Sequence, residues 1–225
     1  MHKQKNFIFV CLMVFSLIMA CFGTGSAQSS DYETNDSTII NEAEPIDEQT
    51  LPDYSTGAGV TMIGDSIMNG NRSIILEQLP DAYIDAKGSR DVCGGFEAAQ
   101  RLDWEGKLTD VVIVELGTNG PLLNHEPYAS GMQNLLELLG TERQIYWVTV
   151  YCSYSQWMRM NNEYIWELHE QNPEKFKVID WYSLAVQHPE WFPDGVHPTI
   201  EGARNFAQLL HDALATNSDD NQVNF

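Results

Sequence analysis

The chain has 225 residues, with 12 basic and 32 acidic side chains and a formal net charge of −20. A length of this order predicts one domain with appendages. Ten of the bases lie within residues 72–204, scattered among acids, and residues 65–212 carry a net charge of about −12. Because phosphate binding needs clustered Lys and Arg, we expect no nucleic-acid partner.

The amino terminus has the pattern of an export signal. Lys3 and Lys5 precede residues 7–22, which are apolar apart from Ser16 and shorter than the roughly 20 residues that span a bilayer. Residues 1–21 are therefore predicted to be a signal peptide. We favour a lipoprotein signal, because Leu-Ile-Met-Ala-Cys at 17–21 resembles a lipobox and would leave a lipid-modified Cys21. Cleavage after Gly-Ser-Ala at 25–27 and an uncleaved anchor are the alternatives.

Both cleavage sites place the protein outside the cytoplasm, lipid-anchored or secreted, with membrane contact only through the signal or the lipid. Residues 22–57 are predicted to be a disordered acidic linker, because residues 28–59 contain eight acids and no base. Residues 216–225 are predicted to be a disordered tail. The two cysteines outside the signal, Cys93 and Cys152, could form a disulfide in such a compartment, but free thiols are the favoured interpretation.

Between residues 58 and 215, short apolar runs alternate with segments of helical periodicity. The predicted strands lie at 60–64, 82–86, 110–116, 144–151 and 177–181. The predicted helices lie at 67–79, 96–108, up to Gly140, 162–171 and 200–214, with Asn161 and Asn162 as candidate caps. This alternation predicts an α/β domain of three layers, with a five-stranded parallel sheet between helices and ligands bound at the carboxyl ends of the strands.

Ser66 follows the first strand and begins the first helix. Unpaired backbone N–H groups and the positive end of the helix dipole favour an anion at such a turn. A serine here suits the formation of an oxyanion. The alternative is that Ser66 is only the helix N-cap.

Asp194 and His197 stand three residues apart near the end of the domain. Pro198 disfavours a helical conformation at His197, so the pair is expected in a turn where the carboxylate can accept the imidazole Nδ1–H. That is the second half of a serine triad. A chance surface turn is the alternative, and a metal site is not expected because no further ligands stand at chelating spacing.

Four segments in this order resemble the signature blocks of SGNH (GDSL-type) hydrolases over residues 58–215: Gly64-Asp65-Ser66, Gly88, Gly117-Thr118-Asn119 and Asp194-Gly195-Val196-His197-Pro198. More narrowly, residues 117–121, 178–182 and 194–197 resemble the extracytoplasmic catalytic domain of peptidoglycan O-acetyltransferases. The resemblance implies a flavodoxin-like SGNH fold. The α/β-hydrolase fold is disfavoured, because Gly64-Asp65-Ser66-Ile67-Met68 is not Gly-x-Ser-x-Gly.

The resemblance also implies roles for the residues of these blocks. Ser66 would be the nucleophile, His197 the general base and acid, and Asp194 the orienting carboxylate. The oxyanion hole would consist of the backbone N–H groups of Ser66 and Gly88 and the side-chain amide of Asn119. No cofactor and no metal is implied. Asp65 is expected to brace the turn.

Three aromatic residues are candidates for substrate binding, namely Tyr154, Trp157 and Trp191, although packing in the core or a lid explains them equally well. The expected function is that of a serine esterase or O-acetyltransferase acting on acetyl esters of cell-envelope glycans. Transfer would require a separate membrane protein as acetyl donor. A lipase or thioesterase of the same fold and a non-catalytic glycan-binding lipoprotein are the alternatives.

Overall fold

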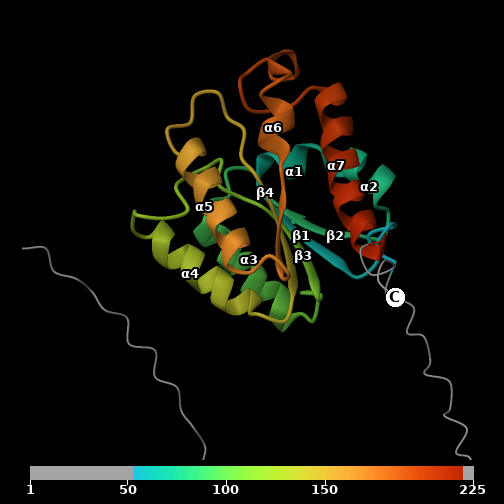
Figure 1. Ribbon diagram of the computed structural model, residues 1–225, viewed down its shortest axis with the longest axis vertical. Helices are drawn as coiled ribbons and strands as arrows, with labels where there is room; N and C mark the ends of the chain where they lie inside the picture. Colours follow the sequence, from blue (N-terminus) through green and yellow to red (C-terminus); the bar gives the residue numbers. More distant parts are fainter. Residues whose placement is uncertain (1–52, 220–225) are drawn as a thin grey trace, which may run out of the picture. The chain divides into compact units, whose positions relative to one another are not determined.

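The computed structural model describes residues 53–219, which lie within one compact unit. The predicted signal peptide, Cys21 and most of the predicted linker lie outside the described residues, as do residues 220–225 of the predicted tail. Figure 1 shows the described part as one sheet with helices on both faces. The strands are β1 Val60–Gly64, β2 Tyr83–Ala86, β3 Val111–Glu115, β4 Gln144–Val148 and β5 Phe176–Ile179.

All five strands are parallel, in the order β2-β1-β3-β4-β5. β2 therefore lies on one side of β1 in the sheet, and β3, the next strand along the chain, lies on its other side. The order therefore reverses between β1 and β3, which is where open α/β sheets bind ligands. Gly64 pairs with Ala86 and with Glu115, so β1, β2 and β3 end side by side. The loops that follow these three strands must meet at one edge of the sheet.

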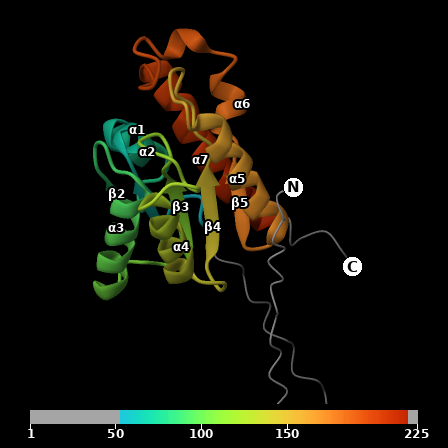
Figure 2. The same ribbon diagram turned by 90° about the vertical axis from the view of Figure 1, so that its left-hand side faces the viewer.

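The helices form the two outer layers. They are α1 Ser66–Gly70, α2 Arg72–Gln78, α3 Val92–Trp104, α4 Tyr128–Leu139, α5 Met158–Gln171, α6 Trp181–Ala185 and α7 Ile200–Asp219, with a 3₁₀ turn η1 at Pro189–Trp191. Successive residues of a strand face opposite sides of the sheet. Met62 accordingly packs with apolar residues of α1, α2, α6 and α7, whereas Ile63 packs with those of α3, α4 and α5. Figure 2 shows the same two layers from the side. The predicted three-layer α/β fold with five parallel strands is confirmed.

Several predicted helix boundaries were wrong. The predicted helix at 67–79 is two helices that meet at Asn71, whose side-chain amide competes with the backbone by donating to the Ile67 carbonyl at 2.8 Å. The helix predicted at 96–108 begins at Val92, after Asp91 accepts the Gly94 N–H as N-cap, and ends at Trp104. The helix predicted at 162–171 begins four residues earlier, so Asn161 and Asn162 lie inside α5 and are not caps.

The carboxyl-terminal half also differs from the prediction. β4 ends at Val148 rather than at residue 151. β5 ends at Ile179, because the Asp180 carboxylate caps the unpredicted helix α6 through the Ser183 N–H. α7 continues to Asp219, so the prediction of disorder is wrong for residues 216–219. None of the described helices is long and apolar enough to cross a membrane.

The end of the predicted linker, residues 53–57, is ordered. Tyr54 packs against the core, and the Asp81 N–H donates to the Thr56 carbonyl at 2.9 Å. Because these residues contact the loop before β2, the folded part begins slightly earlier than residue 58.

Candidate active site

The turn after β1 presents Ser66 at the start of α1. Asp65 is the N-cap, and its Oδ1 accepts the Ile67 N–H at 2.8 Å. The interpretation of Ser66 as the N-cap is therefore wrong, because Asp65 has that role. Ser66 is the first helical residue, and the N–H of such a residue has no partner within its own helix.

The loop between η1 and α7 brings His197 to Ser66. His197 Nε2 lies 3.0 Å from Ser66 Oγ, and His197 Nδ1 lies 2.8 Å from Asp194 Oδ2. The other oxygen of Asp194 accepts the N–H groups of Val196 at 3.0 Å and His197 at 2.8 Å. The structure thus places the three predicted residues in one hydrogen-bonded line, with the imidazole between the hydroxyl and the carboxylate.

This line of residues is open to solvent. The side chains of Asp194 and His197 are 54% and 50% exposed. Hydrogen bonds from the His197 side chain, the His197 N–H and the Val196 N–H lower the pKa of Asp194 to about 2. The carboxylate is consequently ionised over the whole ordinary pH range and can hold Nδ1 of His197 in its protonated form.

Gly195 lets the loop make its turn. Its φ is +86°, and a Cβ at this position would collide with Oγ of Ser153. The Gly195 carbonyl also accepts the Ser153 N–H at 2.9 Å. The loop that carries Asp194 and His197 is therefore fixed against the segment after β4, and only glycine suits that position.

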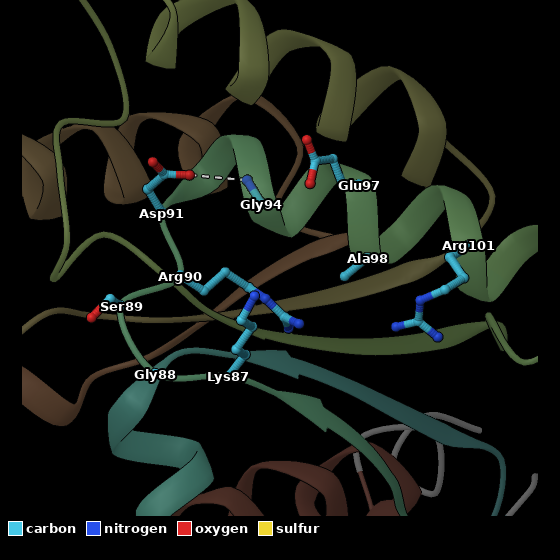
Figure 3. A pocket seen from close by; sticks show the side chains of 9 residues that line it. All are labelled: Lys87, Gly88, Ser89, Arg90, Asp91, Gly94, Glu97, Ala98 and Arg101. Atoms are coloured by element: carbon cyan, nitrogen blue, oxygen red, sulfur yellow. Dashed lines mark hydrogen bonds between the residues drawn. The ribbon is translucent and has the colours of Figure 1, made fainter.

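Gly88 follows β2 and lines a cavity of about 680 Å³ (Figure 3). Its φ is not positive, and an added Cβ would meet no heavy atom within 4 Å. The protein itself therefore does not require glycine at residue 88. Lys87, immediately before it, donates its N–H to the Gly64 carbonyl at 3.2 Å, which keeps this loop next to the turn that carries Ser66.

Asn119 lies in the loop after β3. Its Nδ2 donates to Asp65 Oδ2 at 2.9 Å and to the Arg90 carbonyl at 3.2 Å. The amide thus lies beside the Ser66 turn, and both of its N–H groups have a protein acceptor in this state. The bond to Arg90 is the longer of the two.

The three candidate aromatic residues do not lie together. Tyr154 is 70% exposed, and it lines a cavity of about 310 Å³ together with Asn119 and the half-buried Trp157. Trp191 is only 5% exposed and stacks on the His188 ring at 4.0 Å and on Trp181 at 6.3 Å. The structure therefore argues against substrate binding by Trp191, because its ring is part of the core.

Two further residues hold the site together and were not among the predicted site residues. The buried Asn161 side chain donates to the carbonyls of Gly117 and Gly120 and accepts the Leu122 N–H, so it fixes the loop that carries Asn119. The Arg90 guanidinium, 8% exposed, donates to the Gly64 carbonyl and to Asp85. An asparagine at a core position of an amphipathic helix was the only signal in the sequence for the first of these.

The two cysteines of the described part are free thiols, Cys93 half-buried and Cys152 buried. The alternative of a disulfide between them is therefore not realised. Within residues 53–219, no three His, Cys, Asp or Glu side chains are grouped so that they could hold a metal ion.

The sequence of this chain is similar to parts of known O-acetyltransferases. No protein-family model matches the chain. YrhL of Bacillus subtilis, which carries the name of a peptidoglycan O-acetyltransferase, is 31% identical over 168 residues, which cover 74% of this chain and 25% of YrhL. The O-acetyltransferase OatA of Staphylococcus aureus is 29% identical over 160 residues, covering 70% of this chain and 25% of OatA. The chain thus matches about a quarter of the length of each relative.

Several solved structures have the same fold. The C-terminal catalytic domain of the peptidoglycan O-acetyltransferase OatA of Streptococcus pneumoniae, with a methylsulfonyl adduct, superposes with a TM-score of 0.63 at 25% identity, covering 72% of this chain and 95% of that domain. A GDSL-like lipase of Bacteroides thetaiotaomicron gives a TM-score of 0.57 at 17% identity, covering 70% of this chain and 88% of the lipase.

The described domain therefore belongs to the SGNH (GDSL-type) hydrolases, and the relatives that match its sequence are named as O-acetyltransferases. Within the family it is a homologue of the C-terminal catalytic domain of the peptidoglycan O-acetyltransferases.

Proposed function

We propose that this domain is a serine esterase or O-acetyltransferase that acts on acetyl esters of cell-envelope glycans. The observation that carries the proposal is the line from Ser66 Oγ through His197 to Asp194, with separations of 3.0 and 2.8 Å. The glycan substrate is inferred from similarity to the peptidoglycan O-acetyltransferases.

The first half of the proposed reaction forms an acyl-enzyme. Ser66 Oγ attacks the acyl carbon while His197 Nε2 takes the hydroxyl proton, and Asp194 stabilises the resulting imidazolium. The C–O bond to the leaving alcohol then breaks, and His197 returns the proton to that alcohol. In the second half, His197 takes a proton from water or a sugar hydroxyl as that oxygen attacks the acyl carbon. Collapse releases acetate or an acetylated sugar and restores the Ser66 hydroxyl.

The oxyanion would be held by the N–H groups of Ser66 and Gly88 and by the amide of Asn119. The Ser66 N–H lies at the amino terminus of α1, which favours negative charge. For Asn119 to contribute, one N–H must turn from its acceptor, and the longer bond to the Arg90 carbonyl is the one that breaks more easily.

The nature of the acceptor decides between hydrolysis and transfer, because the same residues serve both. Purified protein incubated with p-nitrophenyl acetate and a chitooligosaccharide, followed by mass spectrometry, separates them. An oligosaccharide heavier by one acetyl group indicates transfer, and free acetate alone indicates hydrolysis. The proposal fails if Ser66→Ala releases p-nitrophenol as fast as the unaltered protein.

The acyl chain length separates this proposal from the lipase or thioesterase alternative. We expect turnover of p-nitrophenyl esters to be highest for acetate and to fall with chain length. A maximum at long chains would favour a lipase, a name that the fold relative from Bacteroides carries. A lack of turnover with all esters, together with binding of the oligosaccharide, would favour a glycan-binding protein.

Export and anchoring are part of the proposal. The signal at residues 1–21 would carry the domain out of the cytoplasm, and a lipid on Cys21 would hold it at the membrane, near a membrane protein that supplies acetyl groups. Fractionation of cells that express the full chain tests this anchor. Cys21→Ser should move the protein from the membrane fraction to the soluble one, and an unchanged distribution would contradict lipid anchoring.

A further inference from the structure

Two buried carboxyl groups lie directly beneath the Ser66 turn. Asp65 is fully buried and Glu115 is 5% exposed. Glu115 is the last residue of β3, and it pairs in the parallel register with Gly64, the last residue of β1. The sheet therefore places the Glu115 side chain against the backbone that leaves β1 towards Ser66.

Glu115 binds the backbone on both sides of Ser66. Its Oε2 accepts the Asp65 N–H at 3.1 Å and the Met68 N–H at 3.3 Å. The N–H groups at the start of a helix have no partner within the helix itself, and a side chain can supply the acceptor. Here one carboxyl oxygen spans the first turn of α1 and fixes the orientation in which Ser66 meets His197.

Asp65 connects the same turn to the predicted oxyanion donor. Its Oδ1 accepts the Ile67 N–H, and its Oδ2 accepts the Asn119 side-chain amide. The two carboxyls together thus bond to three backbone N–H groups around Ser66 and to the amide of Asn119.

Two buried carboxyls in contact are not both ionised at neutral pH, because each charge opposes the other and neither is fully hydrated. Burial raises the pKa of both groups, and for Glu115 the nearby charge of Asp65 adds to this effect and raises its pKa well above 4.5. Hydrogen bonds to Asp65 and the charge of His197 act in the opposite direction on Asp65. The proton therefore belongs on Glu115, and the charge on Asp65.

We propose that Glu115 is a positioning residue of the active site and works as a neutral carboxylic acid. One carboxyl oxygen of Glu115 accepts two backbone N–H groups. The Glu115 O–H keeps its proton and donates a hydrogen bond to the Asp65 carboxylate. In this form it holds Ser66 and, through Asp65, Asn119 in the geometry that the acyl transfer needs. The proposal rests on the proposed function for its catalytic part, whereas the proton on Glu115 can be tested on its own.

Glu115→Gln is the variant that discriminates, because an amide reproduces a neutral acid. The amide oxygen can accept the same two N–H groups, and the NH₂ can donate to Asp65. Glu115→Leu keeps the approximate size but removes the acceptor and the donor. The matched control is Thr61→Val, which removes a buried hydroxyl at the opposite end of β1, where it donates to the Lys107 carbonyl at 2.6 Å.

We expect Glu115→Gln to keep kcat for p-nitrophenyl acetate within about 3-fold, and Glu115→Leu to lower kcat by about 100-fold with little change in KM. Thr61→Val should lower the melting temperature without changing kcat. Two results would overturn the proposal. If Glu115→Gln loses as much kcat as Glu115→Leu, Glu115 acts as an anion. If Glu115→Leu keeps kcat, Glu115 has no positioning role.

The pH dependence of stability tests the proton without reference to activity. An unfolded glutamate loses its proton around its ordinary pKa of 4.5, whereas the folded protein retains the proton on Glu115 to higher pH. The folded state then binds more protons than the unfolded one, so stability falls as the pH rises above 4.5. Relative to Glu115→Gln, the melting temperature of the unaltered protein should decline from pH 5 to 8, and parallel curves would contradict a neutral Glu115.

This second measurement also separates the two proposals. If the unaltered protein and Ser66→Ala turn over the ester equally, the proposed function fails, and the melting curves still decide whether Glu115 is protonated. If Glu115→Leu does not fold, Glu115→Gln and the melting curves remain decisive.

Discussion

His197 Nε2 lies 3.0 Å from Ser66 Oγ, although 131 residues separate the two along the chain. The contact depends on the parallel sheet. The carboxyl end of β1 lies at the edge of the sheet that the loop between η1 and α7 also reaches. His197 takes its place in this loop through bonds to Asp194, on the backbone as well as on the ring. The separation is within reach of direct proton transfer, which makes it the geometric basis of the proposed function.

Asp194→Asn should lower kcat for p-nitrophenyl acetate by about a thousand-fold, because an amide does not stabilise the imidazolium and can favour the wrong imidazole tautomer. The measurement is steady-state kinetics on purified protein. Circular dichroism should show an unchanged fold, because the Asp194 side chain is half exposed. A loss of less than tenfold would argue that Asp194 does not assist His197.

The acid limb of the pH profile should not come from Asp194. Its pKa of about 2 lies below its ordinary value, so its contribution to folding is complete above pH 3.8 and is lost only as the pH falls towards 2. Between pH 7 and 4 the carboxylate remains ionised. We therefore expect the residual kcat/KM of Asp194→Asn, like kcat/KM of the unaltered protein, to keep an acid limb. A limb that disappears in the variant would contradict this prediction.

Gly88→Ala and Gly195→Ala form a matched pair. Gly88 has an ordinary φ and free space around its missing Cβ, so alanine should leave the melting temperature unchanged or slightly raised. We expect it nevertheless to lower kcat about tenfold or more, because the methyl group would enter the space in which the acyl oxygen meets the Gly88 N–H.

Gly195→Ala should act on stability instead. Its positive φ and the collision with Ser153 predict a cost of about 1 to 3 kcal/mol in the free energy of unfolding, measured by urea denaturation. If both variants lose stability equally, Gly88 is a structural glycine and its proposed oxyanion role loses support.

Tyr154→Ala and Trp191→Ala should separate substrate contact from core packing. Tyr154 is exposed beside Asn119, so its loss should raise KM for an acetylated oligosaccharide several-fold and leave p-nitrophenyl acetate and the melting temperature nearly unchanged. Trp191 is buried, so its loss should cost about 3 to 5 kcal/mol of unfolding free energy. An unchanged KM for the oligosaccharide in Tyr154→Ala would remove this residue from the proposed substrate site.

Asn161→Ala should damage the site from a distance. The substitution leaves two carbonyls and one N–H of the Asn119 loop buried without a hydrogen-bond partner. Each such group that water cannot reach lowers the free energy of unfolding by about 1 to 3 kcal/mol. We expect a lower melting temperature together with a lower kcat. Asn162→Ala is the control, because Asn162 bonds only to Val150. It should lose stability while keeping kcat, and equal losses of kcat in both variants would contradict the specific role of Asn161.

The sequence by itself determined the layers of the fold and the residues of the proposed triad. Short continuous apolar runs indicate strands that are covered on both faces of a parallel sheet, whereas apolar residues every three to four positions indicate helices. Ser66 at a strand end and Asp194 with His197 before Pro198 are local patterns, and the resemblance of four segments in order to the SGNH hydrolases joined them into one proposed triad. The predicted strands fall within three residues of the observed ones for this reason.

Only the tertiary structure decided which residues support the site and which side chains meet solvent. For Trp191 and Tyr154 the sequence left substrate contact and packing equally open, yet one ring packs on Trp181 and the other is exposed. In the sequence, a glutamate at the end of an apolar strand such as Glu115 cannot be told from one that is exposed to solvent. Its burial against Asp65 depends on the register of β1 with β3. Burial and pKa depend on neighbours that are remote in the chain, so local patterns do not contain them.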